Sequence, residues 1–550
     1  MNPRCLFLLL LTVFSVAIVS PALAQHEHMG SASEPATLKA GMGSLHHPIA
    51  TTSEEAQKFF DQGLTLVYAF NHGEAVRSFD RAAELDPRSP MPYWGKALAL
   101  GPYYNEAQPD DEKPAYEAIQ KARELQANAP ENERAYVDAL AKRLTDNPKP
   151  DYDALGRSYA AAMREVAQRY PDDPDASTLY AEALMDLHAW DLWTSDGKAG
   201  ENTLEIVSVL ESTLRRWPDH VGANHFYIHA VEASSDPERA MASAERLKTA
   251  VPAAGHLVHM PAHIYIRTGD YDAAVKSNEQ AVAVDNTYQR AMANPNMMYL
   301  MMYGEHNIHF LVFAAMMDGD YAAASRSVKE LESRAMSGVA EVPPAEGFLP
   351  MPSLVLVRFG RWGDVLALPQ PDAKLQGLTF FWHYARGCAF AAKGDAAKAQ
   401  AERDAMESIY KQLPQGIAFS MWYNDWATIH DLAADTLDAR IASARGDLPG
   451  AIAKWNAGVA VQDRMKYDEP PDWYYPIRES LGSLLLRNGK AQEAERVFRE
   501  DLEKNPRNPR SLFGLWKALE AQKKTVDADW VHTSFAESWK GADQPRLEDF

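Results

Sequence analysis

Internal repetition is the feature that most constrains how this chain can fold. A glycine turn between two stretches of helically spaced apolar and small residues recurs along the 550 residues. A unit of helix, tight turn and helix cannot bury its apolar stripe alone, so neighbouring units must stack. The repetition therefore predicts an all-α, right-handed solenoid of helix-turn-helix units. The clearest turns are Gly269-Asp270-Tyr271, Gly319-Asp320-Tyr321, Gly360-Arg361-Trp362, Gly394-Asp395-Ala396, Gly446-Asp447-Leu448 and Gly489-Lys490-Ala491.

The units also share the spacing of their small, aromatic and proline residues. The segment Gln57–Pro87 has Ala82 and a closing proline, and Ala494, Phe498 and Pro506 follow the same order later in the chain. This spacing resembles the tetratricopeptide repeat, and the chain is similar to bacterial exported tetratricopeptide-repeat proteins over nearly its whole length. The resemblance implies a concave surface that holds a ligand, most often a protein or peptide. It implies no particular reaction.

Two irregularities divide the repeats. The period is stretched around Asp191–Gly200, which predicts a loop over one rim of the solenoid. The segment 337–352 is rich in proline and glycine, which predicts a linker between two stacks of repeats. The predicted organisation is a signal peptide at 1–24, a polar segment at 25–52, an amino-terminal stack at 53–336, the linker at 337–352, a carboxy-terminal stack at 353–520 and a cap or tail at 521–550.

The first residues predict export. Arg4 is followed by an apolar run from Cys5 to Val19 and then by Ala22-Leu23-Ala24, the order of a charged start, a hydrophobic region and a cleavage site. The run is shorter than the roughly 20 residues that span a bilayer. We therefore expect a periplasmic or secreted protein without a membrane anchor.

The net charge restricts the partners. The chain carries a formal charge of −21 at pH 7. Such an acidic protein repels phosphate backbones and anionic lipids, so we expect neither nucleic acid nor a membrane surface as a partner.

A cluster of histidines follows the repeat. Seven of the 17 histidines lie between residues 225 and 309. His225 precedes His259 by 34 residues, and His229 precedes His263 by the same 34 residues, which is one full repeat. Stacking of the units is therefore expected to bring both pairs side by side. Alignment on the glycine turns places His225, His259 and His309 at one position of the first helix, Glu182, His229 and His263 one turn later, and His256 with His306 one turn earlier.

Several imidazoles without thiolates suggest a transition-metal site. Neutral histidine is the commonest protein ligand for metals, and such a set suits zinc, copper, iron or nickel. Pro261 is tolerated only in the first turn of a helix, so we expect a helix that starts near Leu257 with His256 at its cap. The predicted ligands are His225, His229, His259, His263, His309 and His256.

The class of protein stays open at this point. If a metal binds with an open coordination position, Glu232, Glu182 and Arg267 are the nearest candidates for catalytic roles. No motif of a metalloprotease, nucleotide-binding protein or serine hydrolase is present, so the sequence does not decide whether the chain is an enzyme. The alternative is a metal-free scaffold, in which duplicated histidines line a concave groove that docks a protein or peptide.

Overall fold

The computed structural model describes residues 36–106, 112–292, 296–340, 342–413 and 424–550. The predicted signal peptide, residues 1–24, lies outside this part of the chain. The described residues form helices and two isolated β-bridges, Tyr103 with Glu106 and Trp193 with Ala199. None of the helices in these segments combines the length and the apolar character that crossing a bilayer requires.

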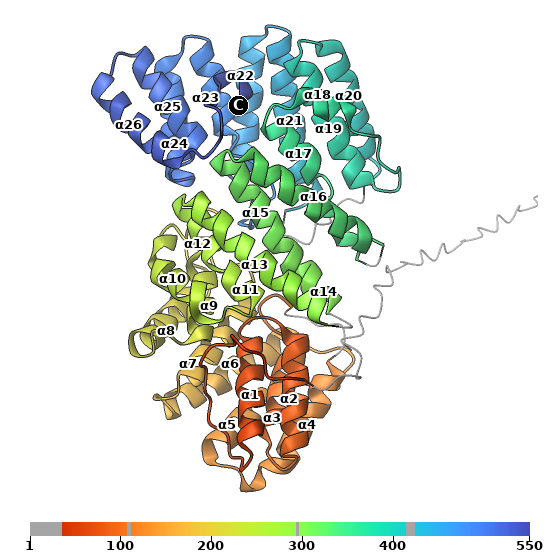
Figure 1. Ribbon diagram of the computed structural model, residues 1–550, viewed down its shortest axis with the longest axis vertical. Helices are drawn as coiled ribbons and strands as arrows, with labels where there is room; N and C mark the ends of the chain where they lie inside the picture. Colours follow the sequence, from red (N-terminus) through yellow and green to blue (C-terminus); the bar gives the residue numbers. More distant parts are fainter. Residues whose placement is uncertain (1–35, 107–111, 293–295, 341, 414–423) are drawn as a thin grey trace, which may run out of the picture.

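Successive helices pack as antiparallel pairs along an elongated molecule (Figure 1). This arrangement confirms the predicted all-α solenoid of helix-turn-helix repeats. The helices of the first half are α1 (Glu54–Val67), α2 (His72–Leu85), α3 (Met91–Leu100), α4 (Lys113–Leu125), α5 (Glu131–Leu140), α6 (Tyr152–Arg169), α7 (Pro174–Met185), α8 (Thr203–Arg216), α9 (Val221–Val231), α10 (Met241–Ala250), α11 (Gly255–His259), α12 (Pro261–Thr268) and α13 (Tyr271–Ala291).

The second half continues the same pattern up to the carboxyl terminus, at the opposite end of the molecule in Figure 1. Its helices are α14 (Met297–Tyr299), α15 (Glu305–Asp318), α16 (Tyr321–Gly338), α17 (Met351–Arg358), α18 (Trp362–Ala367), α19 (Gln376–Ala392), α20 (Ala396–Tyr410), α21 (Trp426–Ala444), α22 (Leu448–Gln462), α23 (Arg478–Arg487), α24 (Ala491–Lys504), α25 (Pro509–Ala521) and α26 (Thr525–Ser538).

The turns have the backbone that the glycines predicted. All six turn glycines named from the sequence have positive φ, from 63° at Gly360 to 88° at Gly319. Other residues adopt this conformation only at a cost, so glycine allows one helix to end and the next to begin within a few residues. The aspartate that follows the glycine accepts a backbone hydrogen bond at the next helix start in several units, as Asp320 does from Ala323.

Helices of neighbouring pairs approach closely at glycine positions. The ring of Phe79 on α2 lies between Gly63 on α1 and Gly95 on α3, and a methyl group on either glycine would come within 2.6 Å of it. Phe498 on α24 fits in the same way between Gly482 and Gly514. In both places a large aromatic ring packs between two glycines, and this contact fixes the spacing between adjacent repeats.

The carboxy-terminal repeats bend back onto the middle of the chain. Arg507 donates to the backbone oxygen of Thr268 at the end of α12, with an Nε to O distance of 3.2 Å. The backbone N–H of Lys540 donates to the carbonyl of Asp318 at the end of α15, at 3.0 Å. The Arg510 side chain donates to the Arg358 carbonyl at the end of α17, at 2.7 Å. Three successive turn ends are thus covered by the last repeats.

The hydrophobic interior consists of two large clusters. One contains buried residues from 42 to 303, and the other contains buried residues from 262 to 528. They overlap in sequence around α12 to α14, well before the linker expected at 337–352. In that segment a 3-10 helix, Pro343–Phe348, packs against α16 and leads into α17. The predicted domain boundaries stay predictions, but the junction between the two cores falls at the histidine-bearing helices.

We predict that Gly95→Ala destabilises the protein by about 1–3 kcal/mol, because the added methyl group overpacks the fully buried Phe79 ring. Thermal unfolding followed by circular dichroism measures the effect. Gly363→Ala is the matched control, since Gly363 lies in α18 with open space around it and alanine favours helices by roughly 1 kcal/mol over glycine. Equal melting temperatures for the two variants would contradict this account of repeat spacing.

Candidate metal centre

Six histidines from four helices meet at the junction of the two cores. Helix α9 carries His225 and His229, α11 carries His256 and His259, α12 carries His263, and α15 carries His306. All six side chains are buried, with residue exposures between 0% and 6%. The sequence predicted an open groove here, whereas the histidines lie in the interior.

Helix α11 is interrupted inside this centre. It begins at Gly255 and ends at His259, and α12 starts at Pro261. Proline has no N–H to continue the ladder, so the chain restarts a helix with proline in its first turn. The expected start near Leu257 was therefore wrong by two residues, and His256 lies inside α11 rather than at its cap. The interruption lets His256, His259 and His263 point into one region.

A second irregularity precedes His306. Residues Leu300–Gly304 form a π-helix that leads directly into α15. Single π-turns inside α-helices are rare and occur frequently at functional sites, where they change the direction of the side chains that follow. Here the turn comes two residues before His306.

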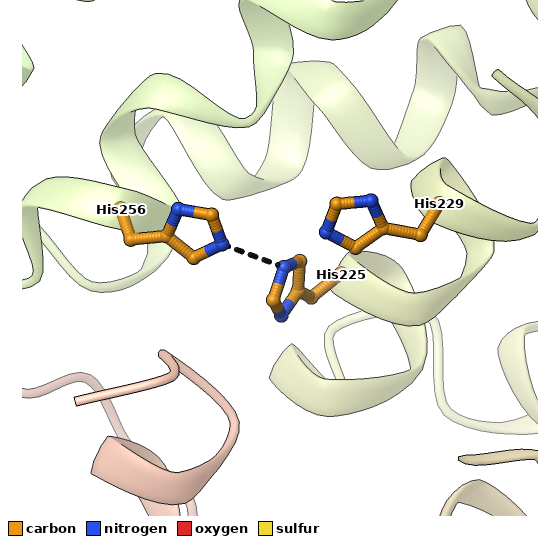
Figure 2. Close-up of side chains that lie close together, drawn as sticks. All are labelled: His225, His229 and His256. Atoms are coloured by element: carbon orange, nitrogen blue, oxygen red, sulfur yellow. Dashed lines mark hydrogen bonds between the residues drawn. The ribbon is translucent and has the colours of Figure 1, made fainter. Parts of the chain in front are cut away.

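The first set of ligand atoms comes from His225, His229 and His256. Their rings point toward one another (Figure 2), and one nitrogen of each lies within 4.8 Å of the others. The Nε2 atoms of His225 and His256 are 3.1 Å apart. The other nitrogens of two rings are held, since His225 Nδ1 donates to the Tyr68 carbonyl at 2.7 Å and His229 Nδ1 lies 2.8 Å from Glu232 Oε1.

The second set consists of His259, His263 and His306, again with ligand nitrogens within 4.8 Å of one another. The Nε2 atoms of His259 and His263 are 2.6 Å apart. His259 Nδ1 lies 2.6 Å from the side-chain oxygen of Asn278, whose amide donates to the Ala274 carbonyl. His263 Nδ1 lies 2.6 Å from Glu232 Oε2.

Two buried carboxylates face these rings. Glu232 ends α9 and contacts one histidine of each set, with Oε1 at His229 and Oε2 at His263. Glu469 lies between α22 and α23, and its Oε1 is 2.5 Å from His263 Nδ1. Tyr467 donates to the other Glu469 oxygen at 2.7 Å. The sequence did not indicate Glu469 as part of the site, because no local spacing connects it to residues more than 200 positions earlier.

Burial sets the protonation of the centre. It lowers the pKa of His225, His256, His259 and His306 well below the ordinary value, with the neighbouring imidazoles adding to the effect. Burial and His263 lower the pKa of His229 to about 3. Burial also opposes a charge on His263, but Glu469 and Glu232 outweigh it and raise the pKa of His263 to about 10. Most of these rings are therefore neutral, as metal ligands must be.

The hydrogen bonds fix which nitrogens carry lone pairs. Both His259 and His263 present Nδ1–H to an oxygen acceptor, so their Nε2 lone pairs face each other across 2.6 Å. Such a contact requires a cation between the two nitrogens, either a proton or a metal ion. In the first set, His229 Nε2 and His256 Nδ1 are buried without a hydrogen-bond partner among the described residues. An unsatisfied buried polar atom costs about 1–3 kcal/mol, so His229 Nε2 fits a coordinating role, whereas the ligand atom of His256 is the Nε2 that faces His225.

Aromatic rings enclose both sets. Phe70, in the turn between α1 and α2, lies 4.6 Å from the His225 ring and stacks on His256 at 5.3 Å between centroids. Its φ of 54° is unusual for a bulky residue. Phe310 on α15 lies 4.7 Å from His259 and 4.8 Å from His263. The insertion predicted around Asp191–Gly200 packs against α9, where Trp193 donates to the Ala230 carbonyl at 2.8 Å, and the preceding Trp190 ring lies 5.7 Å from the His229 ring.

Three of the residues predicted for the site lie apart from these two sets. His309 on α15 is half-buried and its ring lies 5.4 Å from Phe348. The Glu182 carboxylate interacts with Asp186 and Arg143, and burial raises its pKa to about 8. Arg267 donates to the carbonyls of Glu232 and Ser234 at the end of α9. The roles assigned to them stay predictions, and the second set contains His306, which was aligned with His256 but was not among the predicted ligands.

The sequence comparisons agree with the fold. Residues 258–288 match the tetratricopeptide repeat family, and they cover the end of α11, α12 and most of α13. This chain carries tetratricopeptide repeats. The matched repeat includes His259 and His263. No curated protein matches the sequence.

Solved structures with similar helical repeats have low identity to this tetratricopeptide-repeat chain. The human IFIT1 dimer with m7Gppp-AAAA is 12% identical with a TM-score of 0.34, over 89% of this chain and 91% of that one. Yeast Tom70 is 13% identical with a TM-score of 0.29, over 86% of this chain and 90% of that one. The TPR domain of P58(IPK) is 12% identical with a TM-score of 0.22, over 86% of this chain and 99% of that one. Similarities at this level carry no conclusion about what the chain binds.

A separate acidic cluster anchors the segment before α1. His47, Asp173 and Asp175 have ligand atoms close enough for a metal ion, but the carboxylates are already engaged. Asp175 accepts from Tyr68 at 2.6 Å and contacts His47 at 2.8 Å and His220 at 3.0 Å. Asp173 caps α7. We interpret this cluster as a clip that holds the amino-terminal segment and the start of α9 against α7.

Stability should depend on pH through this clip. Burial lowers the pKa of His47, but Asp175 outweighs burial and raises it to about 8 from 6.5. A raised pKa stabilises the fold fully below about pH 6.5, and this contribution of about 2 kcal/mol is lost as the pH rises through 8. We predict that His47→Gln lowers the melting temperature at pH 6 and removes this part of the decrease between pH 6.5 and 8.5.

The neighbouring histidine is the control for this measurement. His46 is exposed and pairs with Asp61, so His46→Gln leaves the contact of His47 with Asp175 in place and should keep the decrease in stability that this contact causes. Identical profiles for His47→Gln and the wild type would show that the clip does not titrate as described.

Proposed function

We propose that this chain is an exported tetratricopeptide-repeat protein that binds a divalent transition metal, copper, zinc or iron, at the buried histidine centre. The observation that carries the proposal is the convergence of histidine nitrogens whose opposite ring nitrogens are held by oxygen acceptors. Metal-binding histidines in proteins are oriented in this way, by a carboxylate or backbone carbonyl on the second nitrogen. His225 with the Tyr68 carbonyl, and His229 with Glu232, both have this arrangement.

The distances support a metal rather than a network of hydrogen bonds alone. Bonds from zinc to histidine nitrogen are about 2.0–2.1 Å, so two ligands of a tetrahedral ion lie about 3.3 Å apart. The Nε2 atoms of His225 and His256, at 3.1 Å, are close to this separation. The 2.6 Å contact between His259 and His263 would lengthen by less than 1 Å when a metal ion replaces the proton between them.

The charges in the centre also favour a cation. Glu232 and Glu469 are both buried to 1% exposure beside His263. Buried carboxylates are costly unless a positive charge compensates them. A divalent ion would supply that charge together with the ligand bonds.

The proposal is limited to binding. Glu232 was predicted as a candidate base, but both of its oxygens contact histidine rings, which is the position of a carboxylate that orients ligands. Export rests on the predicted signal peptide, which lies outside the described residues. Tetratricopeptide solenoids provide extended surfaces for protein partners, and a partner of this chain would contact surfaces other than the buried histidines.

We predict that protein purified without a histidine tag retains stoichiometric metal after dialysis, and that His229→Ala/His263→Ala reduces it to below about a tenth of the wild-type amount. These two histidines hold opposite sides of Glu232, so their removal disrupts both sets of ligands. Elemental analysis measures the metal, and circular dichroism checks the fold of each preparation.

The matched control is His383→Ala/His430→Ala. These histidines pair with Glu402 and Glu407 in the carboxy-terminal repeats, away from the centre, so the double variant should keep its metal. Wild-type protein that is isolated without metal, and that binds no zinc, copper or iron on titration, would disprove the proposal and leave the metal-free scaffold.

A further inference from the structure

The histidine centre contains overlapping sets of candidate ligand atoms, namely two sets of three histidines and a third set in which Glu232 and Glu469 join His229 and His263. His225, His229 and His256 form one group, and His259, His263 and His306 form another, each with its nitrogens within 4.8 Å. Metal bonds of about 2.0–2.1 Å place two ligands of one ion at most about 4.2 Å apart. Among the described residues, no set of ligand atoms within 4.8 Å of one another contains all six rings, whereas three nitrogens suit one ion.

The two sets lie directly side by side. The ring centroids of His229 and His263, one from each set, are 5.5 Å apart. Those of His256 and His259 are 5.8 Å apart and the rings are nearly parallel. These separations are similar to those within each set, for example 4.9 Å between His225 and His256 and between His259 and His306. Ions held in the two sets would be close neighbours.

One carboxylate connects the sets. Glu232 Oε1 lies 2.8 Å from His229 Nδ1, and Glu232 Oε2 lies 2.6 Å from His263 Nδ1. When the Nε2 atoms of His229 and His263 are the ligands, Glu232 contacts the opposite ring nitrogens and acts as a positioning residue that orients one imidazole of each set. A change in the position of the Glu232 side chain at one set would therefore also affect the histidine that it contacts in the other set.

We propose that the centre is dinuclear, with one divalent transition-metal ion bound by His225, His229 and His256 and a second bound by His259, His263 and His306. This inference rests on the proposed metal-binding function. Three protein nitrogens leave each ion with a free coordination position for water or another small ligand. Phe70 covers the first set and Phe310 the second, so each ion has an apolar ring on one side.

The two sites are not equivalent. The second set has an additional carboxylate, because Glu469 contacts His263, while His225 in the first set is held by the neutral Tyr68 carbonyl. A carboxylate on the second nitrogen raises the basicity of a ligating imidazole. We therefore expect the second set to fill first when metal is limiting.

Titration of the full-length, metal-depleted wild-type protein with Co²⁺ tests the stoichiometry without any substitution. The expected result is an optical titration with an endpoint at two equivalents per chain. An endpoint at one equivalent would overturn the dinuclear centre while leaving the proposed function intact. Absence of binding would disprove both proposals at once, so the two failures are distinguishable.

Histidine variants test which residues bind each of the two ions. His225→Ala should reduce the bound metal from two ions to one, His306→Ala should do the same, and His383→Ala should keep two. If either single variant abolished all binding in a chain that remains folded by circular dichroism, the six histidines would form one site. If His306→Ala left two ions bound, the assignment of the second set would be wrong.

Electron paramagnetic resonance tests the distance between the two ions. Paramagnetic ions a few ångströms apart, the separation of two-metal sites, couple magnetically. Wild-type protein loaded with two equivalents of Cu²⁺ should show a coupled electron paramagnetic resonance spectrum, and His225→Ala should show the signal of one isolated Cu²⁺. Glu232→Gln should weaken binding at both sites about 10–100-fold. Two uncoupled wild-type signals, or an effect of Glu232→Gln on one site alone, would overturn the shared centre.

Discussion

The shared contact of Glu232 with His229 and His263 is the interaction on which the interior of this protein depends. Packing six imidazoles away from water is unfavourable unless their N–H groups find acceptors. Glu232 serves two of them, and the Tyr68 carbonyl and the Asn278 side chain serve two more. These acceptors come from the end of α1, the end of α9 and the middle of α13. The polar centre therefore adds directional contacts between these repeats to the packing of rings against glycines, which sets the spacing of adjacent helices.

Much of the fold could be predicted from the sequence, because the repeat signals are local. A glycine with positive φ is recognisable at six of the turns, and the 34-residue period correctly predicted that His229 lies beside His263. Counting from the turns aligned His309 with His259, but the helix that carries His259 is not continuous. The ten residues from His259 to Gly269 cross the break at Pro261, whereas the ten from His309 to Gly319 run along unbroken α15. Equal counts therefore lead to different places, and His306 rather than His309 joins the second set.

The remaining parts of the centre depend on how distant segments meet. Glu469 contacts His263 only because the carboxy-terminal repeats bend back over the ends of α12 and α15, and the curvature of a solenoid is the sum of many small rotations between repeats. The burial of the histidines also results from the way in which the solenoid bends. A groove position is exposed in a single repeat, but it becomes buried when another stack of repeats packs over it. The sequence pattern therefore predicts the repeat length of the solenoid, but it does not predict which distant repeats contact one another.

The bend has a consequence for how the chain matures. The centre takes its parts from Tyr68, near the start of the first repeat, through to Glu469, in one of the last. Domains form as the chain is synthesised from its amino terminus, so the histidines exist for some time before the segment that completes their surroundings. The complete surroundings of the histidines therefore form only when every intervening repeat has packed in its place. A chain that stops short, or misplaces one unit, would carry the histidines without the surroundings that orient them.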